Sequence, residues 1–138
     1  MEVNYWAIFL GAVGSIFLGA IWYGPIFGRK WLEINEVTSA DLARRSEMQK
    51  ETKLLYGLQI IFSLVQMFVF ILVVENTPGM MAFTTAFWIW LGFIVPTVAG
   101  LAMWNAKPVK VRLALFLLSS GYQGLIFLWY ALLLRWLA

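Results

Sequence analysis

Polar side chains are rare in the apolar parts of this sequence, and three of them follow a helical spacing. Gln59, Ser63 and Gln66 lie four and three residues apart, which places them on one face of an α-helix. Amide and hydroxyl groups in hydrocarbon need hydrogen-bond partners. The face therefore predicts either hydrogen bonds between helices or the lining of a polar path. Later segments offer several partners: Thr84, Thr85, Thr97, Ser119, Ser120, Tyr122 and Gln123.

The residues of nucleophilic and metal chemistry are largely missing. The sequence contains no cysteine and no histidine, which excludes thiolate nucleophiles, disulfides, the usual zinc ligands and the commonest general base. Ser119 and Ser120 have no visible base, and no paired carboxylates face a common site. We expect no catalytic residue, no cofactor and no metal, so the protein is predicted not to be an enzyme.

The composition is that of a membrane protein. The chain has 138 residues, of which 62% are hydrophobic and 12% are charged, far from the usage of soluble domains. Four apolar stretches approach or exceed the roughly 20 residues that cross a bilayer as a helix, at about residues 6–23, 54–74, 80–104 and 113–136. We predict an all-α membrane protein, a four-transmembrane-helix bundle that forms a single membrane domain over residues 1–138. The first span is expected to be retained and not cleaved as a signal peptide, because its start has no basic residue.

The basic residues predict the orientation of the bundle. All but one of them lie between the first and second spans or between the third and fourth. By the positive-inside rule, both connections are expected to face the cytoplasm and both termini to lie outside it. Because these residues flank membrane helices, the net charge of +3 does not indicate nucleic-acid binding. They are Arg29, Lys30, Arg44, Arg45, Lys50, Lys53, Lys107, Lys110 and Arg112.

The stretch IWYGPIFGRKW, residues 21–31, predicts how the first span ends. Gly24 suits a left-handed helix terminus, and Pro25 cannot continue the helical hydrogen bonds. The residues beyond Pro25 are expected to form a short amphipathic segment at the membrane surface. The alternative is a turn that binds a ligand. This interfacial motif comprises Trp22, Tyr23, Gly24, Pro25, Phe27, Gly28 and Trp31.

The connection at residues 24–53 is predicted to include a short cytoplasmic helix. Thr38 or Ser39 could cap its start, and no helix-breaking residue follows from Ala40 to Leu55. The helix is therefore expected to continue directly into the second span.

Two features of the spans concern helix packing. Ala7, Gly11, Ser15 and Gly19 recur every four residues, and such a small-residue stripe lets helix backbones approach closely in lipid. Its partner is either another helix of the same chain or the first helix of a second subunit. Pro96 is predicted to bend the third span and to act as a hinge.

A set of aromatic residues lies deeper in the spans than the interfacial tryptophans and tyrosines. These residues provide either lipid-facing bulk or the lining of a cavity. They are Trp88, Trp90, Trp129 and Tyr130.

A short repeat also joins the first and third spans. AIWYGP from Ala20 matches AMWNAKP from Ala102, which is consistent with two helical hairpins in parallel orientation.

Several short motifs resemble those of the DUF1761 family of small bacterial membrane proteins. They are Trp22-Tyr23-Gly24-Pro25, Phe27-Gly28 and Trp31, followed by Gly92-Phe93, Thr97 and Gly121-Tyr122. The resemblance implies a four-helix protein of the bacterial inner membrane. It supplies no activity and no site residue, because the family is of unknown function.

Two functions remain open. The first, which we favour on sequence, is a non-enzymatic interaction protein that assembles with itself or a partner membrane protein through the small-residue stripe. The second is a small oligomeric transporter or channel for a neutral or amphiphilic solute, with Pro96 as its hinge. Membrane lipid is a partner in both cases. In the second, the path is lined by Gln59, Ser63, Gln66, Tyr122 and Gln123.

Overall fold

The computed structural model describes residues 4–34 and 45–137. The described chain is helical, with two five-residue π-helical segments, labelled η1 and η2, inside longer helices. The elements in chain order are α1 (Tyr5–Ile21), η1 (Trp22–Ile26), α2 (Gly28–Ile34), α4 (Arg45–Glu75), α5 (Ala82–Ile89), η2 (Trp90–Ile94), α6 (Val95–Ala102) and α7 (Val109–Leu137).

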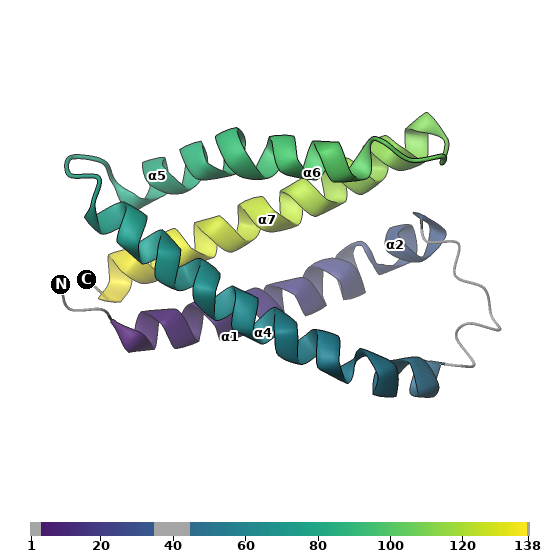
Figure 1. Ribbon diagram of the computed structural model, residues 1–138, viewed down its shortest axis with the longest axis horizontal. Coiled ribbons are helices and arrows are strands. Elements are labelled where there is room, and N and C mark those ends of the chain that lie inside the picture. Colours follow the sequence, from purple (N-terminus) through teal and green to yellow (C-terminus); the bar gives the residue numbers. More distant parts are fainter. Residues whose placement is uncertain (1–3, 35–44, 138) are drawn as a thin grey trace.

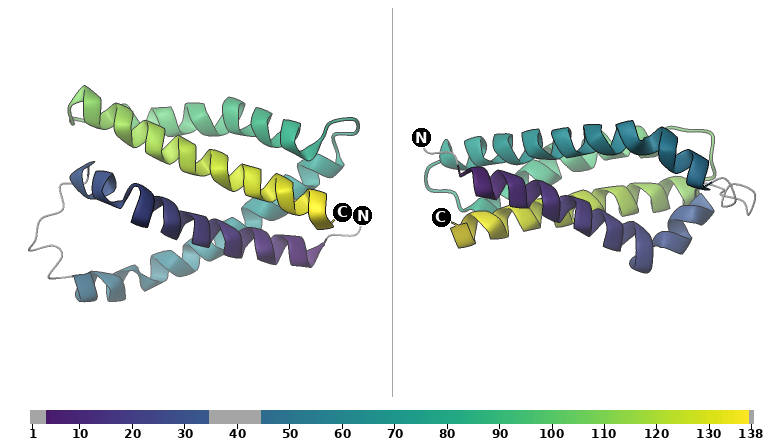
Figure 2. Two further views of the ribbon diagram at one scale, coloured as in Figure 1. Left: turned by 180° about the vertical axis from the view of Figure 1, so that it is seen from behind. Right: turned by 90° about the horizontal axis from the view of Figure 1, so that it is seen from below.

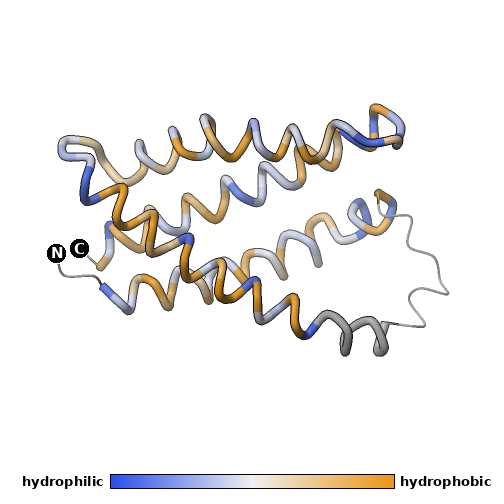
Figure 3. Tube along the Cα trace, viewed as in Figure 1, coloured by the Kyte–Doolittle hydropathy of each residue, from blue (hydrophilic) through white to orange (hydrophobic). Residues whose placement is uncertain are grey.

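Four helices in the described part of the chain are long and apolar enough to cross a membrane, which confirms the predicted number. They cover Tyr5–Ile26, Lys53–Glu75, Ala82–Ala102 and Val109–Leu137. Apolar residues follow the lengths of these helices, and polar residues gather at their ends (Figure 3). The arrangement is compatible with a multi-pass membrane protein, because every backbone group inside such a helix is satisfied without water.

Helices α1 and α7 lie side by side in the middle of the bundle. Helix α7 packs on one side against α5, η2 and α6, while α1 packs on its other side against α4. Helix α4 runs diagonally across the bundle, so that it lies near α5 at one end and diverges from α6 at the other (Figures 1 and 2). We call the end that carries Asn4 and Leu137 the N/C end, and the other the α2 end.

The core lies between α4, α5 and α7 and extends to the start of α1. Met67 and Tyr130 are both 0% exposed. The ring of Phe70 packs edge-on against that of Phe127, with 5.6 Å between the ring centroids. The Tyr130 hydroxyl donates a hydrogen bond of 2.9 Å to the side-chain oxygen of Gln66. An aromatic residue expected to be lipid-facing bulk or cavity lining is thus a core residue, and its hydrogen bond makes burial tolerable.

The first span does not end where the sequence predicted. Helix α1 continues through Pro25 as the π-helical segment η1, and the Phe27 N–H donates to the Trp22 carbonyl at 2.9 Å. A π-helical turn has an extra residue, which gives a proline ring room that a regular α-helix lacks. Gly24 is not left-handed either: within residues 4–34 and 45–137, the only glycine with positive φ is Gly79, at 85°.

The third span is interrupted near the predicted position. Segment η2 ends at Ile94, and α6 begins at Val95, directly before Pro96. The Thr97 hydroxyl donates to the Phe93 carbonyl at 2.5 Å, a bond to the carbonyl four residues earlier that threonine commonly makes inside a helix. That Pro96 acts as a hinge remains a prediction.

Two connections meet at the α2 end. Helix α4 begins at Arg45, before the span that starts at Lys53, so a helix does continue directly into the second span. The proposed caps Thr38 and Ser39 lie outside the described residues.

The Lys107 ammonium donates a 3.2 Å hydrogen bond to the Ile34 carbonyl, which joins the α6–α7 connection to the end of α2.

Candidate functional site

The small-residue stripe lies inside the fold. A Cβ added to Gly11 would lie 2.7 Å from Met67 Cγ, and one added to Gly19 would lie 2.7 Å from the Tyr122 hydroxyl oxygen. Ala7 and Ser15 are buried. The stripe therefore lets α1 approach α4 on one side and α7 on the other, all within one chain.

A groove of about 650 Å³ opens between α1 and α4 toward the α2 end. We call it the α1–α4 groove. One wall runs from α1 through η1 to Trp31 of α2, the other wall belongs to α4, and Tyr122 of α7 contributes from behind. None of its described lining residues carries a charge. They are Ser15, Ile16, Gly19, Ala20, Tyr23, Gly24, Trp31, Tyr56, Gln59, Ile60, Ser63 and Tyr122.

The polar atoms of the groove lie within helices that are long and apolar enough to span a membrane. The Gln59 amide nitrogen donates a long hydrogen bond of 3.4 Å to the Ser63 hydroxyl. The Tyr122 hydroxyl donates to the Ser15 carbonyl at 2.9 Å, and its ring packs against that of Tyr23 with 5.3 Å between centroids. A glutamine amide can make four hydrogen bonds, and within the described part of the chain Gln59 makes one. The groove can therefore offer both a donor and an acceptor to a ligand.

The five predicted path residues do not lie together. Gln59, Ser63 and Tyr122 line the groove, whereas Gln66 is bound to Tyr130 and Gln123 is not a lining residue. The reason is the diagonal course of α4, which carries its later half from the groove into the core.

The hydrogen-bond partners predicted for the α4 face are wrong for Gln66. Its partner is Tyr130. The hydroxyls of Thr85, Thr97 and Ser120 instead donate to carbonyls three or four residues earlier in their own helices, a local bond that competes with partners on other helices.

Three tryptophans join helices by a contact that the sequence analysis missed. The indole N–H of Trp22 donates to the Leu118 carbonyl at 3.1 Å, and that of Trp90 to the Ser120 carbonyl at 2.8 Å. Trp129 donates to the Leu10 carbonyl at 3.1 Å. These tryptophans are structural donors within the candidate membrane spans, while Trp88 is exposed.

Each of these indoles lies over a glycine of the helix that it contacts. A Cβ on Gly121 would lie 3.0 Å from the Trp22 ring, and one on Gly124 would lie 3.0 Å from the Trp90 indole nitrogen. A Cβ on Gly14 would overlap the indole of Trp129. The absence of a side chain is what lets the indole N–H reach a backbone carbonyl.

A repeated sequence pattern could have revealed two of these three tryptophan contacts. Both π-helical segments have the form Trp-x-Gly-x-Ile, at Trp22–Ile26 and Trp90–Ile94. The predicted repeat instead paired Trp22 with Trp104, which is 81% exposed. The structural counterparts are therefore Trp22 and Trp90.

The interfacial motif divides between packing and the groove. Trp22 packs on α7, with Phe27 against its ring at 4.6 Å between centroids. Tyr23, Gly24 and Trp31 line the groove. No group of three or more metal-ligating side chains comes together within residues 4–34 and 45–137.

The family model "Protein of unknown function (DUF1761)" matches residues 6–135, nearly the whole chain. The chain belongs to the DUF1761 family. No curated protein and no solved structure matches it. Membership in DUF1761 confirms the resemblance drawn from the sequence motifs and assigns no activity, so function rests on the groove and its chemistry.

Proposed function

We propose that this protein is a non-enzymatic membrane protein that binds an uncharged amphiphilic solute in the α1–α4 groove and moves it within the bilayer. The observation that carries the proposal is Gln59, an amide with one long hydrogen bond in the wall of a groove at membrane depth. In hydrocarbon, such an amide is stabilised by a hydrogen bond to any ligand that carries a hydroxyl or amide group.

The lining favours a neutral polar group over a charged one. A charged headgroup would lose its hydration in the groove without meeting an opposite charge, because the described lining residues are uncharged. Ile16, Ile60 and the rings of Tyr23 and Trp31 offer apolar surface for a hydrocarbon tail. Segment η1 forms part of the wall, and π-helical turns are frequent at functional sites.

Assembly through the small-residue stripe is the function that the sequence analysis favoured, and the geometry supports it less than it supports binding in the groove. Met67 and Tyr122 of the same chain already cover Gly11 and Gly19. A second subunit could reach the stripe only if α1 separated from α4 or α7. A larger assembly that leaves the stripe in place is compatible with a solute path.

We further propose that the α2 end faces the cytoplasm of a bacterial inner membrane, because the basic connections meet there. The chain has no cysteine, so single cysteines report accessibility cleanly. A membrane-impermeant maleimide should label Asn76→Cys in intact cells and should leave Asn105→Cys unlabelled; the reverse pattern would contradict this orientation.

Photolabelling in nanodiscs tests the binding proposal. The probes are a monoacylglycerol with a diazirine in its acyl chain and its phosphorylated counterpart, which adds negative charge. The neutral probe should label groove residues more strongly than the phosphorylated probe does. Gln59→Leu should lower this labelling by about fivefold, the effect of one hydrogen bond worth about 1 kcal/mol.

Gln123→Leu is the matched control, because it removes the same amide from a position outside the groove. Equal labelling by both probes would overturn the preference for a neutral solute. Equal loss in Gln59→Leu and Gln123→Leu would show that the groove amide does not bind the probe.

A further inference from the structure

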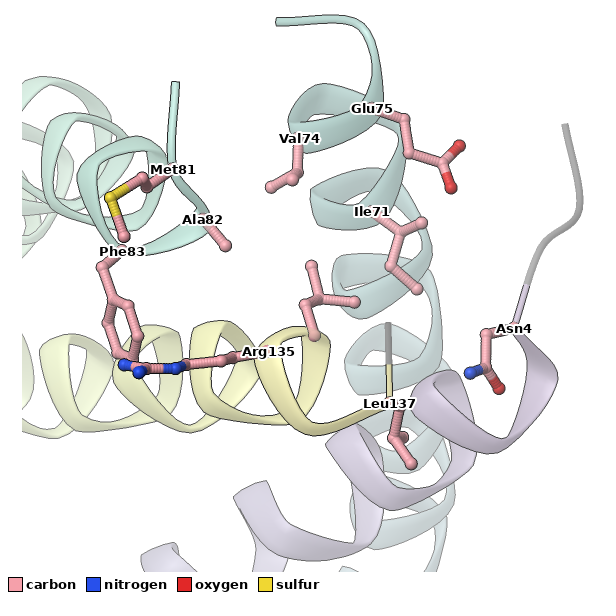
Figure 4. Close-up of a pocket in the computed structure, with 10 residues that line it drawn as sticks. Asn4, Ile71, Val74, Glu75, Met81, Ala82, Phe83, Arg135 and Leu137 are labelled. Atoms are coloured by element: carbon pink, nitrogen blue, oxygen red, sulfur yellow. The ribbon is translucent and has the colours of Figure 1, made fainter. Parts of the chain in front are cut away.

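A second hollow, of about 740 Å³, lies at the N/C end, opposite to the α1–α4 groove. Helices α4, α5 and α7 contribute to it, together with Asn4, the residue that caps the start of α1 (Figure 4). Its inner part is apolar and includes Ile71, Val74, Phe83 and Leu134. Because α4 and α7 both end here, the hollow lies at the level where hydrocarbon gives way to headgroups.

Two opposite charges stand on opposing sides of this hollow. Glu75 lies on the side of Asn4, while the Arg135 side chain extends along α7 toward Phe83 (Figure 4). Within residues 4–34 and 45–137, neither Glu75 nor Arg135 has an ion-pair partner. The two side chains do not neutralise each other, so a ligand with separated positive and negative groups would match both.

The hollow continues along the seam between α5 and α7. A smaller hollow of about 390 Å³ shares Phe83 with it and is lined further along by Phe87, Trp90, Phe127 and Gly124. The Trp90 indole N–H is already donated to a backbone carbonyl, so this wall is suited to hydrocarbon.

The length of the seam suits an acyl chain. Leu134 lines the first hollow and Leu125 the second. They are nine residues apart on α7, which corresponds to about 14 Å of helix. This is roughly half of the 30 Å hydrocarbon layer, the depth of one leaflet.

We propose that this end of the protein binds a zwitterionic phospholipid of the adjoining leaflet. Arg135 binds its phosphate, Glu75 binds its ammonium group, and one acyl chain lies over Phe83 in the α5–α7 seam. An anionic phospholipid would satisfy Arg135 alone and would leave the Glu75 carboxylate beside additional negative charge.

Competition between two lipids tests this site. The full chain is reconstituted in nanodiscs of equimolar palmitoyl-oleoyl phosphatidylethanolamine and phosphatidylglycerol, and native mass spectrometry measures the lipids retained after release. Phosphatidylethanolamine should be retained over phosphatidylglycerol by about three- to fivefold, as expected for one exposed ion pair. Glu75→Gln should remove this preference, and Arg135→Gln should lower the retention of both lipids.

Two controls separate this site from the rest of the protein. Glu33→Gln changes an exposed carboxylate near the other end, and Gln59→Leu changes the α1–α4 groove; both should leave the lipid ratio unchanged. Equal retention of the two lipids by the native chain would overturn the proposal. So would a Glu75→Gln protein that is folded by circular dichroism and keeps the native preference.

Discussion

Replacing Gly14 with alanine should destabilise the bundle through a single contact. The added Cβ would overlap the indole of Trp129, whose N–H donates a hydrogen bond to the Leu10 carbonyl. The ring must move, which costs about 1–3 kcal/mol when extra atoms enter a packed core. Loss of the indole hydrogen bond adds about 0.6 kcal/mol, a typical value between membrane helices. Together these give an expected loss of about 2–4 kcal/mol in the free energy of unfolding.

Reversible unfolding in mixed micelles, followed by circular dichroism, measures this loss. Gly57→Ala is the matched control, because a Cβ at Gly57 meets nothing within 4 Å, and alanine favours a helix over glycine. Combining Gly14→Ala with Trp129→Leu should cost less than the sum of the two single changes, because the second change removes the ring that obstructs the first. Equal stabilities of Gly14→Ala and Gly57→Ala would refute the reasoning.

Two further substitutions test the hydrogen bonds of buried aromatic residues. Tyr130→Phe should lower the free energy of unfolding by about 1–3 kcal/mol, because it leaves the Gln66 amide without its partner, whereas Tyr56→Phe, at an exposed ring, should change little in the same titration. Trp90→Phe should cost about 1–2 kcal/mol through the lost indole donor and a smaller ring; a loss no greater than that of the exposed Trp88→Phe would contradict its structural role.

Properties that depend on local composition and spacing could be predicted from the sequence. Hydropathy alone located four spans, because a helix in lipid needs a long apolar run whatever it packs against. The spacing of Gly11 and Gly19 indicated close packing, but it left the partner open. The choice between α4, α7 and a second subunit depends on the shape of the whole bundle.

The roles of individual side chains could not be predicted in the same way. Trp129 and Trp88 both lie in apolar segments, yet Trp129 donates a hydrogen bond to α1 and Trp88 is exposed. Their difference arises from the glycine that α1 presents to α7 at Gly14. Pro25 was wrongly expected to end a helix, because the prediction considered α-helical hydrogen bonds and not the wider π-helical turn.

The groove was only partly predictable. The spacing of Gln59 and Ser63 placed both on one face of α4, and the structure brings that face against α1. The same spacing also grouped Gln66 with them, although the crossing angle of α4 carries Gln66 to Tyr130 in the core. A helical face read from sequence continues along the helix, whereas the groove ends at Ser15 and Ser63, just before α1 and α4 come into close contact at Gly11 and Met67.

The α1–α4 groove exists only if α1 packs on α4 of the same chain, and an engineered disulfide tests this most directly. A Cβ at position 11 lies 3.3 Å from Met67 Cβ, close to the 3.5–4.5 Å that a disulfide spans. Gly11→Cys combined with Met67→Cys also removes the Met67 atoms that a Cβ would otherwise meet. Oxidation in nanodiscs should give a crosslink within single chains, seen as a monomer of altered mobility. Crosslinked dimers, formed by this protein or by Gly11→Cys alone, would place α1 against a second subunit and contradict the account.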